Sequence, residues 1–411
     1  MNIFQSSVEK LSWWQLTSIQ IGGAICMPVL MVGQQIAVHY GLLAAAIAIA
    51  LGNLFLLSVG IPYIQLAYEK KYSTIQNAIN CFGKAGTFIV GVSMLVALIG
   101  WFAIQLQLVS LSSVHLLNIC FGQDICTSIF VTIFWGAIMT LMALFGLRSI
   151  NMLADLSMPL LVLTIGYATL KAAYMPFKAV PVEMGLLKGI TLVIASTLLV
   201  VVDIPTYYRH ARSTKDSFFS LFLLYAFATP LIQLVGAYIA LHSNGSSIVD
   251  MFAQQGGFWW QLWIGSFLIL AGWTTNNTNI YSAAITLESF FPSLNYYLRI
   301  IPIGIVGTIA ACFPMIAHYE RTLSGMAISV ASMGAVVMVS FLFERFTNNF
   351  KEYNYKMPAL LSWVIGSTLG VLSFLGYVQL TGSTLLDTFI VSSLTAYFGF
   401  LIIAYFSEKY A

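Results

Sequence analysis

Apolar runs of roughly 20 residues recur from one end of the chain to the other, and each is long enough to cross the hydrocarbon core of a bilayer as a helix. Only 8% of the residues are charged, whereas a soluble globular chain has about 25%. The runs lack the alternation of apolar and polar positions that a transmembrane β-barrel requires. The sequence therefore predicts an all-α polytopic membrane protein.

We predict one transmembrane domain covering residues 1–411 with twelve spanning helices. Because twelve is even, both termini lie on one side of the membrane. Thirteen of the lysines and arginines fall on that side, which favours cytoplasmic termini in a plasma (bacterial inner) membrane. The exceptions are Lys171, Lys178, Lys188 and Arg321. The predicted spans are 13–38, 41–67, 84–118, 127–147, 151–173, 186–207, 216–242, 257–288, 296–317, 321–344, 357–378 and 384–406.

Two runs contain residues that interrupt helices. In the first run, Pro28 lacks an N–H and clashes with the preceding turn, so we expect the helix to open near Ala24–Met27. In the sixth, Asp203 and Pro205 interrupt the second half. The interpretations are a simple proline kink or a discontinuous helix whose open carbonyls bind an ion or solute. The separation of five spans favours two inverted five-span repeats with a binding site between the broken helices.

The third run carries an aromatic ring and an amide at membrane depth. Trp101 lies too deep for the interfacial belt in which membrane tryptophans usually sit. Gln105 is four residues later and therefore on the same helix face. A ring that stacks and an amide that reads an edge suit a flat, polar heterocycle. The alternative is a packing tryptophan and a glutamine that joins helices.

Six consecutive residues in the eighth run, 274–279, carry side chains that require hydrogen bonds. At 100° per residue they cover most of the helix circumference, so this segment cannot face lipid. Interhelical hydrogen bonds, worth about 0.6 kcal/mol each, account for one or two such groups rather than six. The adjacent hydroxyls of Thr274 and Thr275 suit a hard cation, which leaves the asparagines for a solute.

Nothing in the sequence indicates an enzyme. The five histidines are scattered, the five cysteines lack metal-ligand spacing, and there is no nucleophile elbow, zinc-protease motif or phosphate-binding loop. The net charge of +3 gives no indication of a nucleic-acid partner. The expected partners are a small-molecule substrate and the bilayer, with no obligate protein partner evident.

Three segments together resemble the nucleobase–cation symporter family, most closely its cytosine permeases. They are "GWFAIQ" (100–105), "ASTLLVVVDIPTYYRHARSTK" (195–215) and "GWTTNNTNIYSAAI" (272–285). The resemblance extends over nearly the whole chain. It implies a LeuT-type fold in which two inverted five-helix repeats, 13–173 and 186–344, precede two additional helices at 357–406.

The resemblance also implies a function and a set of site residues. Members of this family import nucleobases or related heterocycles, such as hydantoins, allantoin and vitamin precursors, usually with Na⁺ or H⁺. Thr274 and Thr275 match the paired hydroxyls that hold sodium, with the backbone carbonyls of Met27 and Leu30 completing the shell. The implied substrate-binding candidates are Gln34, Trp101, Gln105, Ser196, Thr197, Asn276 and Asn279.

One departure concerns Thr197, which stands where these permeases often have a second aromatic residue. Stacking on both faces of the substrate is therefore not implied, and the substrate class is better defined as a small heterocycle than as cytosine. Sodium-coupled uptake is the function that we expect, with proton-coupled uptake as the alternative. A channel or a non-transporting receptor is the alternative of another class, although no repeated pore-lining signature is present.

Proton coupling would use Asp155 or Asp203, because carboxylates inside membranes often mark proton relays. Both lie near predicted span ends, and Asp203 is close in sequence to Arg209 and Arg212. We therefore expect a salt bridge or another structural role for Asp203.

Overall fold

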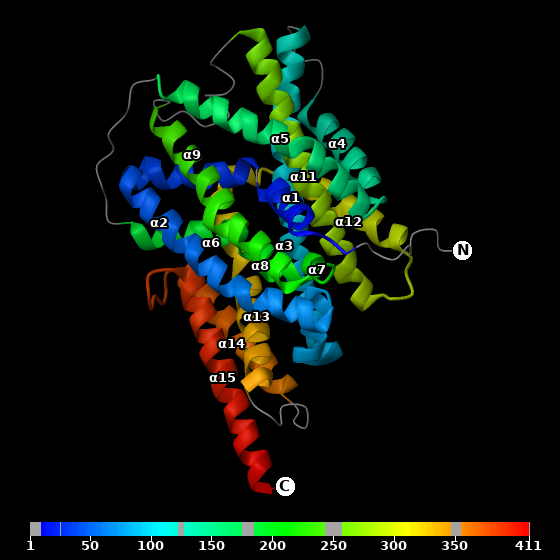
Figure 1. Cartoon of the computed structure of the whole chain (residues 1–411), viewed down its shortest axis with the longest axis vertical. Helices are drawn as coiled ribbons and strands as arrows, with labels where there is room; N and C mark the ends of the chain where they lie inside the picture. Colours follow the sequence, from blue (N-terminus) through cyan, green and yellow to red (C-terminus); the bar gives the residue numbers. More distant parts are fainter. Residues whose placement is uncertain are drawn as a thin grey trace.

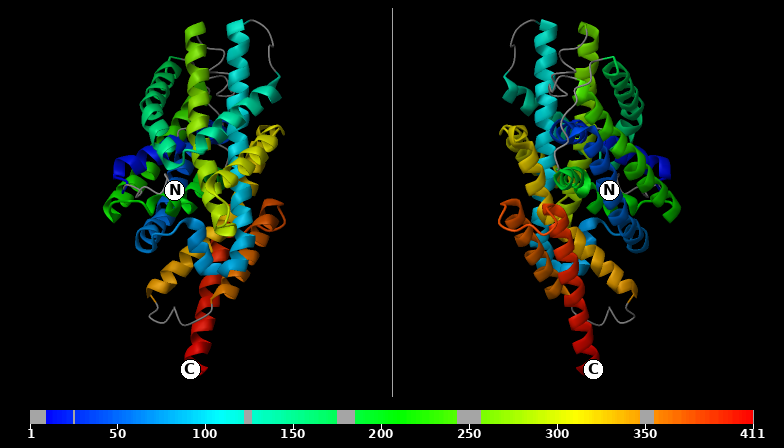
Figure 2. Two further views of the ribbon diagram at one scale, coloured as in Figure 1. Left: turned by 90° about the vertical axis from the view of Figure 1, so that its right-hand side faces the viewer. Right: turned by 90° about the vertical axis from the view of Figure 1, so that its left-hand side faces the viewer.

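The computed structural model describes residues 10–24, 26–121, 127–174, 185–242, 257–346 and 355–410. Within these ranges the regular elements are all helical, apart from one isolated bridge between Leu11 and Ala211. Figures 1 and 2 show an elongated bundle from which the C-terminal helix projects at one end. The all-α prediction is therefore confirmed for the described residues.

The helices vary widely in length because several are broken or kinked. They are α1 (Trp13–Ala24), α2 (Met27–Lys70), α3 (Thr74–Phe121), α4 (Ser128–Ala143), α5 (Leu147–Ala172), α6 (Leu186–Val202), α7 (Ile204–Tyr208), α8 (Thr214–Phe222), the π-helix η1 (Leu223–Ala228), α9 (Thr229–His242), α11 (Phe258–Phe290), α12 (Tyr296–Ala311), the 3₁₀ helix η2 (Ile316–His318), α13 (Tyr319–Phe346), α14 (Lys356–Phe374) and α15 (Thr384–Tyr410).

Seven helical segments in the described part of the chain are long and apolar enough to cross a membrane. The helices Ser128–Ala143 and Tyr296–Ala311 are apolar but shorter. These lengths identify an integral membrane protein, while the total of twelve spans stays a prediction. Glycines with positive φ divide two of the longest helices, at Gly41 (φ 81°) in α2 and Gly83 (φ 71°) in α3. Both positions fall at predicted span boundaries.

The first and sixth predicted spans are both broken, as their sequences predict. The helix α1 ends at Ala24 and α2 begins at Met27, with Cys26 in an extended conformation between them. The helix α6 ends at Val202, and α7 begins directly after Asp203. A proline occupies the first turn of both α2 and α7, where its missing N–H breaks no helical hydrogen bond.

The broken helices lie among the most closely packed elements of the bundle. The helix α3 packs along α11, while α2 packs against both α9 and α6, and these helices enclose the middle of the molecule (Figure 1). The helices α14 and α15 pack against each other and against α13. That the last two helices are additions to a core of two repeats stays a prediction.

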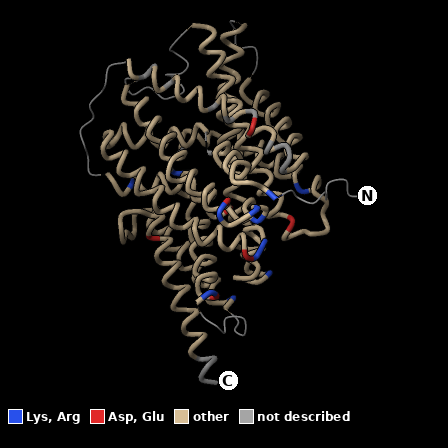
Figure 3. Tube along the Cα trace, viewed as in Figure 1, with Lys and Arg blue, Asp and Glu red and all other residues tan. Residues whose placement is uncertain are grey.

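Charged residues are sparse on most of the helices, and Figure 3 shows several of them gathered in one region of the molecule. The described residues form three ion pairs: Lys70–Glu344 at 2.6 Å, Arg345–Glu69 at 3.1 Å and Arg299–Glu288 at 2.5 Å. All of these residues belong to the side of the membrane that we predict to be cytoplasmic. The membrane-spanning middle parts of the helices therefore carry few charged side chains, as a bilayer requires.

The crossing of α2 and α9 depends on two small residues. A Cβ atom on Gly236 would overlap the carbonyl oxygen of Leu30, and one on Gly33 would overlap the carbonyl oxygen of Gln233. Small residues allow such close approach of helix backbones in membranes.

We expect Gly236→Ala to lower the free energy of unfolding by about 1–3 kcal/mol, because the added methyl group forces these two helices apart. Gly166→Ala in α5 is the matched control, since a Cβ atom there meets nothing within 4 Å. Thermal unfolding of both variants in detergent measures the difference. Equal midpoints for the two variants would show that the close crossing contributes nothing to stability.

Candidate functional site

A small cavity of about 60 Å³ lies between the two broken helices. It is lined by residues of α1, α2, α3, α6, α7 and α11 and by the break between α1 and α2. Both interruptions reach it, because Cys26 from the first break and Asp203 from the second are part of its wall. This is the location that the inverted-repeat interpretation predicts for a binding site.

Four of the predicted substrate-binding residues meet at this cavity. Trp101 of α3, Ser196 and Thr197 of α6, and Asn279 of α11 all line it. Trp101 is buried, with 7% of its surface exposed. The Oγ1 atom of Thr197 and the Nδ2 atom of Asn279 are buried without a hydrogen-bond partner among the described residues. The cavity therefore combines an aromatic ring with polar groups that are available to a ligand.

The other three predicted substrate-binding residues lie outside the cavity wall. Gln105 is one turn from Trp101 and fully buried, yet both atoms of its amide lack a hydrogen-bond partner among the described residues. Asn276 points toward α4, where its Nδ2 atom contacts the sulfur of Met139 at 3.2 Å. Gln34 lies in α2, away from the cavity.

The cavity-facing residues of α11 form one helical stripe. Thr275, Thr278, Asn279 and Ser282 line the cavity at spacings of three, four and seven residues. Side chains at these spacings share a face, whereas Asn276 and Asn277 lie on other faces. Sequence reasoning missed Thr278 and Ser282, although the spacing from Thr275 would have identified both.

The hydroxyls of Thr274 and Thr275 both turn toward the first break. The Oγ1 atom of Thr274 donates to the carbonyl of Gly22 at 2.9 Å, and that of Thr275 donates to the carbonyl of Gly23 at 3.1 Å. Both hydroxyls also lie 2.9 and 3.1 Å, respectively, from the carbonyl oxygen of Ala271. Five neutral oxygens therefore converge where the last turn of α1 meets α11.

The two carbonyls predicted to complete the ion shell lie beyond the break, in α2. Met27 is the first residue of that helix, and the carbonyl of Leu30 faces Gly236 of α9. The carbonyls that the threonine hydroxyls contact are instead those at the end of α1. No group of three or more histidine, cysteine or acidic residues is arranged to hold a metal ion in the described part of the chain.

Two residues of α7, Thr206 and Tyr207, connect this helix to the site. The hydroxyl of Tyr207 lies 2.9 Å from both the carbonyl oxygen of Thr278 and the Oγ atom of Ser282, which joins α7 to α11 beside the cavity. Asp203 accepts a hydrogen bond from the Oγ1 atom of Thr206 at 2.6 Å. Tyr207 was not among the predicted site residues, because the chain has 20 tyrosines and nothing in the sequence distinguishes this one from the others.

The arginines that follow Asp203 have other partners. Arg209 donates to His210 and to Gln76, and Arg212 donates to the carbonyl of Lys10. Among the described residues, Asp203 forms no salt bridge within 4.0 Å. Proximity in sequence therefore did not lead to an ion pair here.

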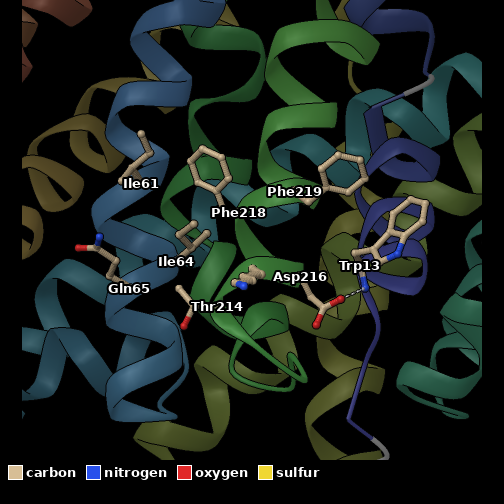
Figure 4. Close-up of a pocket in the computed structure, with 9 residues that line it drawn as sticks. Trp13, Ile61, Ile64, Gln65, Thr214, Asp216, Phe218 and Phe219 are labelled. Atoms are coloured by element: carbon tan, nitrogen blue, oxygen red, sulfur yellow. Dashed lines mark hydrogen bonds between the residues drawn. The ribbon is translucent and has the colours of Figure 1, made fainter.

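A larger cavity of about 560 Å³ lies at the edge of the bundle, between the start of α1, the end of α2 and α8 (Figure 4). Its wall is mostly apolar, with Ile61, Ile64 and Phe218 on one side and Trp13 on the other. The carboxylate of Asp216 accepts the backbone N–H of Trp13 at 3.1 Å and so joins α8 to α1. None of the predicted site residues contributes to it.

No family model matches the chain. The chain is similar in sequence to the cytosine permease of Escherichia coli strain K12, with 21% identity over 332 residues that cover 77% of this chain and 74% of the permease. The cytosine permease of Escherichia coli O157:H7 aligns with the same identity and coverage. The identity is low, but the alignment extends over most of both chains.

The fold is also similar to solved transporter structures. Mhp1, a nucleobase-cation-symport-1 family transporter solved in a closed conformation with bromovinylhydantoin bound, superposes with a TM-score of 0.78 at 16% identity, covering 98% of this chain and 96% of that one. The inward-facing conformation of Mhp1 gives 0.75 at 17% identity, covering 98% and 95%. An outward-open Na⁺-coupled sialic acid symporter gives 0.67 at 12% identity, covering 96% and 89%. The chain thus has the LeuT-type fold of these symporters, and its predicted resemblance to nucleobase–cation symporters is confirmed.

Proposed function

We propose that this protein is a secondary active transporter that imports a nucleobase or related small heterocycle by sodium-coupled symport with alternating access. The observation that carries the proposal is the cavity between the broken helices, where Trp101 lies with the Nδ2 atom of Asn279, which is unpaired among the described residues. The ring supplies a stacking surface, and the amide supplies a hydrogen-bond donor. A cytosine permease and a hydantoin-binding symporter as relatives support the same substrate class.

The proposed ion site is the group of neutral oxygens around Thr274 and Thr275. The carbonyls of Gly22, Gly23 and Ala271 replace those of Met27 and Leu30 in this assignment, because the threonine hydroxyls contact them directly. Hydroxyl and carbonyl oxygens suit hard cations, and a set without carboxylates suits a single positive charge. A sodium ion there supplies the charge that draws these oxygens, and hence α1 and α11, together.

Substrate entry requires the helices around the cavity to separate. Its volume of about 60 Å³ is well below the range of about 300–1,000 Å³ that is usual for small-molecule sites. The hydrogen bonds from Tyr207 to α11 close the α7 side, which is cytoplasmic in the predicted topology. These bonds break when the site opens inward, and solute and ion then leave together.

A ligand screen tests the substrate class. Purified protein is heated with cytosine, uracil, purines, hydantoins, allantoin and pyrimidine vitamin precursors, each with and without sodium. A heterocycle at about 100 times its Kd is expected to stabilise the folded state by about 2.7 kcal/mol, with a larger shift when sodium is present. A panel in which no heterocycle shifts the unfolding transition contradicts the proposed function.

Proton-coupled transport is the second candidate, favoured by the buried carboxylate of Asp203 in the cavity wall. In that case uptake follows an inward proton gradient and is unaffected by sodium. Sodium-driven accumulation in vesicles without a pH gradient distinguishes the two. Uptake that saturates and exceeds the external concentration also separates both from a channel or a receptor.

A further inference from the structure

Asp203 is a carboxylate at the break between α6 and α7, inside a membrane-spanning segment. Its backbone is non-helical (φ −90°, ψ 2°), and only 5% of its surface is exposed. It lines the same cavity as Trp101 and Asn279. Asp203 is therefore part of the wall of the space in which a substrate is proposed to bind.

No cation forms an ion pair with this carboxylate among the described residues. A buried carboxylate is costly unless it is paired and hydrogen-bonded. It has roughly four lone-pair sites, and Thr206 supplies one short hydrogen bond while the hydroxyls of Thr74 and Ser282 lie nearby. Arg209, whose charge acts on this group, is bonded to His210 and Gln76 rather than to Asp203.

Among the described residues, the cavity wall therefore contains a carboxylate without an ion-pair partner and an amide donor without a hydrogen-bond partner. Asp203 accepts hydrogen bonds, and the Nδ2 atom of Asn279 donates one and is unpaired among the described residues. A ligand that satisfies both must carry N–H donors toward Asp203 and a ring nitrogen or carbonyl acceptor toward Asn279.

We propose that Asp203 is a specificity-determining residue that accepts hydrogen bonds from an exocyclic amino group of the substrate, so that the site selects amino-substituted heterocycles over their oxo analogues. This inference rests on the proposed function, because it assigns a role in the same cavity. Its physical basis is that a carboxylate opposite a substrate carbonyl leaves two acceptors facing each other without a proton. Sites that hydrogen-bond one substrate group reject analogues lacking it.

The test compares matched pairs, cytosine with uracil and adenine with hypoxanthine, by equilibrium binding to the purified full-length protein. For the wild type, the amino member of a pair that binds is expected to have the lower Kd. Asp203→Asn retains an oxygen to accept from Thr206 but presents an amide donor to the cavity. In this variant, the Kd of the oxo member divided by the Kd of the amino member is expected to be about ten- to a hundredfold lower than in the wild type, or the preference is expected to invert.

Asp216→Asn is the control, because Asp216 is a carboxylate in α8 outside this cavity and its substitution is expected to leave the ratio unchanged. An unchanged ratio in Asp203→Asn overturns the inference, including the case in which the variant loses only a pH dependence of uptake. A wild type that binds uracil as tightly as cytosine, and hypoxanthine as tightly as adenine, overturns it without any variant. A wild type that binds no heterocycle overturns the proposed function, and the inference with it.

Discussion

Replacing Thr274 and Thr275 together by valine is expected to abolish sodium-stimulated uptake. Valine keeps the shape of threonine but removes both hydroxyl oxygens from the group that meets the carbonyls of Gly22 and Gly23. Loss of a partner in the second shell of a metal site already costs about 10–100-fold in affinity, so removal of two direct ligands is expected to cost at least that much. The measurement is radiolabelled uptake as a function of sodium concentration.

The double variant also leaves three backbone carbonyls, those of Gly22, Gly23 and Ala271, with fewer partners, and each group left unsatisfied destabilises the fold by about 1–3 kcal/mol. For this reason, the shift in unfolding temperature on adding sodium is compared with each variant's own baseline. Thr286→Val is the matched control, because this buried threonine of the same helix bonds only the carbonyl of Ser282 among the described residues. Full sodium stimulation in the double variant would remove these threonines from the coupling site.

The two helix breaks were predictable because their causes are local. Pro28 and Pro205 each lack the N–H that a continuous helix needs, so each interruption can be recognised from a few consecutive residues. The division of α2 at Gly41 follows from local chemistry as well, since glycine readily adopts the positive φ found there. A bilayer strengthens such signals by requiring continuous hydrogen bonding everywhere else.

The roles of the α11 asparagines were not predictable from sequence because they depend on which neighbour covers which face. The periodicity places Asn276 and Asn279 about 60° apart around the helix and does not say which of the two faces the cavity. In the structure α4 covers Asn276, whereas Asn279 faces the broken helices. The same limit applies to Gln105, which shares an approximate face with Trp101 but lies outside the cavity wall.

Asp203 shows how proximity along the chain can mislead. Arg209 and Arg212 are six and nine residues away, and a salt bridge or another structural role was the expected outcome. The break after α6 places Asp203 in the cavity wall, whereas Arg209 donates to Gln76 and Arg212 donates to the carbonyl of Lys10. A break that changes the direction of the chain also changes which residues are neighbours, and helical periodicity carries no information about that change.

Trp101→Ala is expected to weaken heterocycle binding by between about five- and a hundredfold. The reason is that stacking of a base on an aromatic side chain is worth about 1–3 kcal/mol. Thr197 occupies the other candidate stacking position, so among the predicted substrate-binding residues Trp101 alone supplies an aromatic face. Binding of a hit from the ligand screen, measured at saturating sodium, gives the Kd ratio of variant to wild type.

Truncating a buried tryptophan also costs about 3–5 kcal/mol of stability, so binding must be separated from folding. Trp101→Phe retains an aromatic face and is expected to recover most of the affinity. Trp135→Ala is the matched control, because Trp135 packs on Trp273 and bonds Ser113 outside the cavity; it is expected to lower stability with little effect on Kd. If Trp101→Ala and Trp135→Ala weaken binding equally, the ring of Trp101 acts only through packing, and the stacking role assigned to it is wrong.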